Sequence, residues 1–95
     1  MTPRGWLLLV LAFGCKDQTW KRYGDRLVEC NVSLRHLGTR APWVKHKLDG
    51  ASDERLVADN VFSAAFVVHV NRELACTEKA AGCTEILRCI EQAPN

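Results

Sequence analysis

Five cysteines stand in a chain of only 95 residues, and they constrain the fold more than any other feature. A domain of this size buries only roughly 60–65% of the surface that its unfolded chain exposes, so a hydrophobic core alone stabilises it weakly. Small exported domains commonly compensate with disulfide bonds. The chain has room for a single domain, and its cysteines predict that covalent bridges hold that domain together.

The start of the chain has the layout of an export signal. A positive charge at Arg4 precedes an unbroken apolar run over residues 6–13, and Cys15 follows after one small residue. Eight apolar residues are too few to cross a hydrocarbon core as a helix, which needs about twenty. We therefore predict a cleaved signal peptide over residues 1–14 and one small helical domain over residues 15–95. The competing interpretation is an ordinary buried N-terminal segment.

Two kinds of cleavage fit the end of this leader. Ala12 and Gly14 lie at positions −3 and −1 relative to Cys15, where a common signal peptidase accepts small side chains. The same stretch, Leu11-Ala12-Phe13-Gly14-Cys15, resembles the lipobox of small Gram-negative bacterial lipoproteins. That resemblance implies a diacylglycerol on the Cys15 sulfur, which anchors the protein to a membrane. Lys16 in the next position then implies sorting to the outer membrane.

The clearest helical periodicity lies in residues 17–37. Apolar side chains recur there at steps of three and four residues, in one stripe: Trp20, Tyr23, Leu27, Cys30, Leu34 and Leu37. Asp17 can cap the start, and Gly38 stands where a glycine commonly ends a helix. Within this segment Asn31-Val32-Ser33 matches a glycosylation sequon. We predict one continuous helix, with Cys30 facing the core or a partner helix.

The middle of the chain predicts a connection and a central helix. Residues 38–52 are expected to form the connection, with a short helical turn over residues 42–48. Ser52 is the expected N-cap of a helix that reaches about residue 75, apolar nearly all round in its second half. The β-branched residues within 66–70 make a strand the main rival there.

The tail predicts a helical hairpin, because Gly82 interrupts it and Thr84 can cap a last short helix. If lipid occupies Cys15, an even number of cysteines remains for disulfides: Cys30, Cys76, Cys83 and Cys89. Cys76 and Cys89 lie at matching distances from the hairpin turn, which favours Cys76–Cys89 with Cys30–Cys83. The pairing Cys30–Cys89 with Cys76–Cys83 stays open. The predicted fold is an all-α, disulfide-stapled bundle of three to four helices.

The charge is unevenly distributed, although its net value is only +2. Residues 16–47 carry a balance of +5 and residues 48–95 a balance of −4. The two halves either attract each other within the domain or present a surface to a partner. Basic residues near one aromatic ring form a candidate site for anionic lipid headgroups or acidic polysaccharide: Arg35, Arg40, Trp43, Lys45 and Lys47. The alternative is a solvated loop with Trp43 packed onto the bundle.

No motif predicts catalysis or metal binding. The histidines at 36, 46 and 69 form no His-Glu-x-x-His pair, and the cysteine spacings are wider than those typical of zinc sites. Neither a Cys-x-x-Cys redox pair nor a phosphate-binding loop is present. We expect no cofactor, no nucleic-acid partner and no enzymatic activity. The prediction is an exported, lipid-anchored envelope module with an interaction or structural role, and the alternative is a secreted helical factor without lipid.

Overall fold

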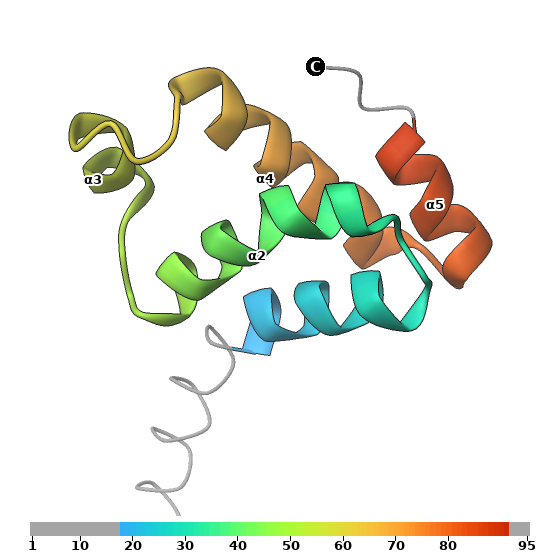
Figure 1. The fold of residues 1–95 in the computed structure, drawn as a ribbon. Helices are drawn as coiled ribbons and strands as arrows, with labels where there is room; N and C mark the ends of the chain where they lie inside the picture. Colours follow the sequence, from blue (N-terminus) through green and yellow to red (C-terminus); the bar gives the residue numbers. More distant parts are fainter. Residues whose placement is uncertain (1–17, 92–95) are drawn as a thin grey trace, which may run out of the picture.

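The computed structural model describes residues 18–91, and this part of the chain consists of helices without a strand (Figure 1). A first helix is seen over residues 18–29. Four more follow it: α2 (Leu34–Leu48), α3 (Asp53–Ala58), α4 (Ala64–Lys79) and α5 (Cys83–Glu91). The predicted all-α, disulfide-stapled fold is confirmed, but the described residues form five helices instead of three or four. The predicted signal peptide and Cys15 lie outside the described residues.

The single helix predicted over residues 17–37 is wrong in its second half. Asn31 adopts a left-handed conformation, with φ of 57°, and the helix ends before it. The N–H of Val32 donates to the Leu27 carbonyl at 3.1 Å, the bond that closes a helix in the Schellman motif. Ser33 then caps α2, its side chain accepting from a backbone N–H one turn later. The segment Asn31-Val32-Ser33 therefore ends one helix and begins the next.

The predicted connection over residues 38–52 is mostly helix. Gly38 and Pro42 both lie inside α2, and Gly38 does not end a helix as expected. Leu34, assigned to the buried stripe, is 85% exposed because the chain turns before it and α2 starts a new helical register. The four-residue break over residues 30–33 is what moves the Leu34 side chain out of the core.

The predicted central helix is divided in the same way. Ser52 caps its start as predicted, accepting from the Arg55 N–H, but α3 ends after only six residues. Asn60 is left-handed, with φ of 58°, and the Val61 N–H donates to the carbonyl of Leu56 at 2.9 Å. A further serine then caps α4. As a result Val61 lies in the connection between α3 and α4 and is 43% exposed.

The C-terminal part forms the predicted helical hairpin. Residues 66–70, where a strand was the rival interpretation, lie within α4. The chain turns at residues 80–82, and α5 begins at Cys83, one residue before the expected cap Thr84. Figure 1 shows α5 beside the C-terminal half of α4.

The core lies where the five helices meet. In Figure 1 the 18–29 helix lies side by side with α2, and α4 runs along the other side of α2. Each helix contributes at least one almost fully buried side chain: Tyr23, Leu27, Trp43, Leu56, Val70 and Ile86. Trp43 is the largest of them, and the rings of Trp20, Phe62 and Phe66 meet it edge-on.

Two disulfides staple this core, in the pairing that the hairpin geometry favoured. Cys30–Cys83 ties the end of the 18–29 helix to the start of α5, and Cys76–Cys89 joins α4 to α5. Their Cα–Cα distances of 5.1 and 5.8 Å lie in the normal range. Beside the first bridge, the guanidinium of Arg26 donates to the carbonyls of Thr77 and Ala80 and so closes the C-terminus of α4.

Candidate functional site

The basic patch predicted around Trp43 is not formed. Trp43 is 0% exposed, and Lys47 lies over its ring while forming an ion pair with Asp53. Arg35 and Lys45 are exposed, but on other sides of α2. The five residues do not form one exposed patch because helical periodicity separates them. Positions 40, 43 and 47 share one face of α2, and this face packs into the core. The remaining member, Arg40, belongs to a buried polar cluster.

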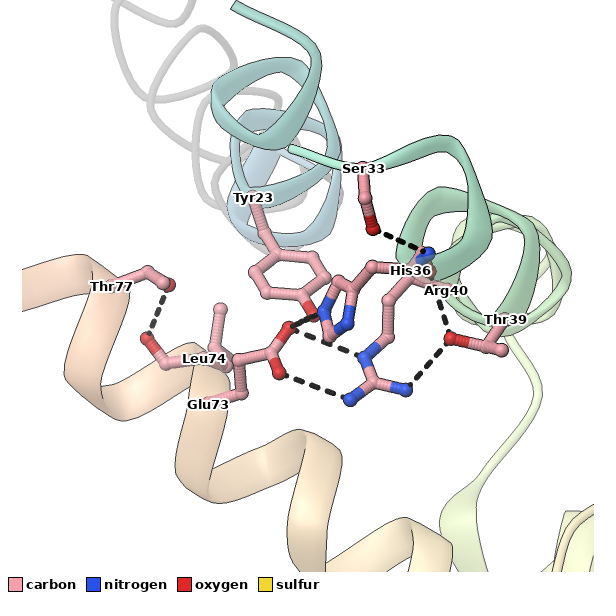
Figure 2. A network of polar contacts seen from close by, with 8 residues as sticks. All are labelled: Tyr23, Ser33, His36, Thr39, Arg40, Glu73, Leu74 and Thr77. Atoms are coloured by element: carbon pink, nitrogen blue, oxygen red, sulfur yellow. Dashed lines mark hydrogen bonds and ion pairs between the residues drawn. The ribbon is translucent and has the colours of Figure 1, made fainter. Parts of the chain in front are cut away.

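This cluster centres on Glu73 of α4 (Figure 2). The Arg40 guanidinium donates through Nε to Oε2 at 3.2 Å and through Nη2 to Oε1 at 3.0 Å. Nε2 of His36 lies 2.9 Å from Oε2, and the Tyr23 hydroxyl also donates to this oxygen. Because an ionised carboxylate only accepts hydrogen bonds, the His36 Nε2 must carry a proton. Three helices therefore converge on one buried carboxylate.

The cluster keeps Glu73 ionised. Burial alone raises the pKa of this carboxyl, but the hydrogen bonds from His36, Arg40 and Tyr23 outweigh burial and lower the pKa to about 2. Burial and the adjacent Glu73 carboxylate raise the pKa of the Tyr23 hydroxyl, so it remains a donor. Burial opposes the charge on Arg40, but the bonds and charge of Glu73 raise its pKa. The charges of Arg40 and Glu73 therefore neutralise each other within the hydrogen-bonded cluster.

A pH dependence of stability follows from Glu73. Its pKa is lower in the folded protein than its ordinary value of about 4.5, so the stabilisation is complete above pH 4.5 and is lost as the pH falls toward 2. We expect the free energy of unfolding to fall by up to about 3 kcal/mol over this interval, the equivalent of the pKa shift. Urea unfolding at pH 7, 4 and 2.5 measures this change.

Repeating that experiment at high salt distinguishes the contribution of Glu73 to stability from the contributions of the surface charges. The exposed pairs Lys21–Asp25 and Arg55–Asp59 are screened by added salt, whereas the buried contacts of Glu73 are not. The fall in the free energy of unfolding at low pH should therefore persist in about 0.5 M salt. A stability that stays level from pH 5 to 2.5 at that salt concentration would contradict the assignment.

The geometry of the cluster fits a structural role. The Glu73 side chain is 0% exposed, and the residues that line the described cavities do not include it. Its oxygens are occupied by donors from the protein itself, so a substrate finds no access to them. Sequence reasoning overlooked the cluster. The available signal was Glu73 as the only acidic residue of the 61–74 segment, in which most residues are apolar, since a buried charge requires a partner.

In contrast to the buried cluster, an apolar groove is open to the surface of the molecule. It has a volume of about 440 Å³ and lies between the 18–29 helix and α2. Its apolar lining comes from both helices: Leu27, Val28, Leu37, Ala41, Val44 and Leu48. Gly24 also lines it and has no side chain; a Cβ there would lie 3.6 Å from Val44. The missing side chain helps to keep the groove open.

The groove lies along a side of α2 that adjoins the core-facing side, and Leu37 and Val44 contact both the groove and the core. Leu37, Ala41, Val44 and Leu48 recur at steps of four, three and four residues, which aligns them along one side of the helix. The groove extends onto the surface at Val28, which is 62% exposed. Its volume lies within the roughly 300–1,000 Å³ range that is typical of ligand-binding clefts. Among the described cavities it is the one with the most apolar lining.

Neither a metal centre nor a membrane span is found in residues 18–91. His, Cys, Asp and Glu side chains do not gather there in groups of three that could bind an ion. The helices of this part of the chain are too short or too polar to cross a bilayer. Comparison of the chain with protein-family models, curated proteins and solved structures finds no match.

Proposed function

We propose that this protein is exported and lipid-anchored at Cys15, and that it serves in the cell envelope as a non-enzymatic interaction module. The observation that carries this proposal is the combination of two disulfides with an apolar groove that is open to the surface. Disulfides persist in oxidising compartments, so their presence supports export. A groove lined by apolar side chains supports binding of a partner.

The interior supports a role without catalysis. The most strongly perturbed titratable groups, Glu73 and Tyr23, hydrogen-bond each other inside the core. Enzymes place such groups where a substrate can reach them, and here they join helices instead. The basic patch that the sequence suggested does not support binding to an anionic membrane surface, because Trp43 and Arg40 are buried. Attachment to the membrane then depends on lipid at Cys15.

The test is the intact mass of the chain recovered from Gram-negative cells, with and without reduction. We expect a membrane-fraction species that lacks residues 1–14, carries the added mass of acyl chains and gains four protons on reduction. The same truncated chain without added mass would instead support a secreted helical factor. An uncut, unmodified chain in the cytosol would overturn the proposal. Hydrolase activity that tracks the oxidised fold would contradict its non-enzymatic part.

A further inference from the structure

Another cavity lies over the Cys76–Cys89 disulfide, between α4 and α5. We propose that this bridge is a site of thiol–disulfide exchange that selects anionic thiols, and that Lys79 and Arg88 are the groups that attract them. The observations behind this assignment are that both cysteines line one open cavity and that two cations line it with them. The exchange is a property of the oxidised fold and does not rest on the proposed function.

The cavity makes the bridge accessible. It has a volume of about 550 Å³ and lies where α5 runs beside the C-terminal half of α4 (Figure 1). Both cysteines of the bridge line it; Cys76 is exposed, whereas Cys89 is only 6% exposed. A thiolate must reach one sulfur of a disulfide directly in order to react with it. An open cavity lined by both cysteines provides this approach.

The charges around the cavity favour an anion. Within residues 18–91 neither Lys79 nor Arg88 forms an ion pair, so their charges are not neutralised by a neighbouring carboxylate. The Glu85 carboxylate also lines the cavity, but it accepts from the Ala81 N–H at 3.2 Å, at the turn before α5. Two cations against one carboxylate leave one positive charge in excess. A thiol that carries a second, permanent negative charge is therefore attracted to the bridge.

The exchange proceeds in two steps. The incoming thiolate attacks the Sγ of Cys76, the more exposed cysteine; the S–S bond breaks, and its electron pair leaves on the Sγ of Cys89. Cys89 takes a proton from water, and the incoming thiol remains on Cys76 as a mixed disulfide. A second thiolate attacks the sulfur of this bound thiol, releases a small-molecule disulfide and leaves Cys76 reduced. Two thiols have then given two electrons to the bridge.

The Cys30–Cys83 bridge provides an internal comparison. Cys83 is exposed at the start of α5, but Cys30 is 8% exposed, and the residues that line the described cavities include neither of them. We therefore expect an anionic thiol to open Cys76–Cys89 first. The intact Cys30–Cys83 bridge would still tie the 18–29 helix to α5.

Three small thiols of different charge test this selection on the purified, oxidised full chain with Cys15→Ser, in which the added reagent supplies every free thiol. They are the anion 2-mercaptoethanesulfonate, the neutral 2-mercaptoethanol and the cation cysteamine. Acid stops the reaction at intervals, and mass spectrometry of peptic peptides locates the mixed disulfides. The rates of their formation are compared per thiolate, because only the thiolate attacks. At low salt the first adduct of the anion should appear on Cys76.

Lys79→Gln with Arg88→Gln separates attraction of the anion from the intrinsic reactivity of each thiol. The ratio of the anionic to the cationic rate should be about three- to tenfold lower in this variant than in the parent chain. The matched control is Arg35→Gln with Lys45→Gln, which removes two exposed cations of α2 that do not line this cavity. Its ratio should change by less than about twofold. In the parent chain, about 0.5 M salt should lower the ratio as the cavity variant does.

An unchanged ratio in a folded Lys79→Gln/Arg88→Gln chain would overturn the proposal, and so would first adducts on Cys30 or Cys83. The salt comparison needs no substitution, so it decides the same question if the variant does not fold: a ratio that salt leaves unchanged contradicts the attraction. None of these results bears on export, which the mass of the cell-derived protein reports separately.

Discussion

Replacing Glu73 by alanine is expected to lower the free energy of unfolding by about 3 to 5 kcal/mol, the cost of leaving a buried charge without its partner. Arg40 is 5% exposed and would keep its positive charge without a counter-charge. Tyr23 and His36 would lose the acceptor that they share. For a domain with a total stability of about 5 to 15 kcal/mol, this loss brings the fold near its limit. Urea unfolding followed by far-ultraviolet circular dichroism measures it.

Glu78→Ala is the control, because Glu78 is exposed on the same helix. It should change the free energy of unfolding by less than about 0.5 kcal/mol. The double substitution Arg40→Met with Glu73→Leu removes both charges together and should recover most of the loss, as uncharged replacements of buried ion pairs commonly do. An unfolding midpoint in Glu73→Ala equal to that of the parent chain would show that the buried pair does not stabilise the fold.

Removing the Cys30–Cys83 bridge should cost about 4 kcal/mol, and removing Cys76–Cys89 about 3 kcal/mol. The difference follows from the sequence separations of 53 and 13 residues, since a longer loop loses more entropy when it is closed in the unfolded chain. The double serine substitution at each bridge is compared by urea unfolding. Both are made in a chain that carries Cys15→Ser, so that no free thiol can exchange with the remaining bridge.

The order of the two effects is the critical result. The parent for both comparisons is the Cys15→Ser chain with its two bridges intact, and the same chain in excess reductant should lose both contributions. Equal unfolding midpoints for the parent and the Cys30→Ser/Cys83→Ser chain would contradict the stapling of the 18–29 helix to α5. A larger loss at Cys76–Cys89 would show that loop length does not control the stabilisation.

Local sequence signals predicted much of the fold. Helical periodicity, the Ser52 cap and the Gly82 interruption each depend on residues within a few positions of one another, and the structure confirms that they mark helices and a hairpin. The favoured disulfide pairing came from the same local reasoning, because Cys76 and Cys89 are symmetric about a short turn.

The helix boundaries could be predicted only in part. Asn31, Gly50 and Asn60 each adopt positive φ, and a serine cap follows each of them within three residues. This repeated arrangement of a left-handed residue and then a serine divides residues 18–79 into four helices, and the turn at residues 80–82 separates the fifth. Asparagine adopts the left-handed conformation less readily than glycine, and the apolar stripe continued across Asn31, so periodicity favoured one long helix.

The candidate site depended on tertiary structure. The sequence by itself determined that the chain forms amphipathic helices, because their periodicity and caps come from neighbouring residues, and the number and spacing of its cysteines indicated that disulfides staple them. Only the tertiary structure decided that Arg40 faces Glu73, 33 positions away, and that Leu37 and Val44 face an open groove. The physical reason is that a helix has several apolar or charged sides, and which one is buried depends on the helices that pack against it.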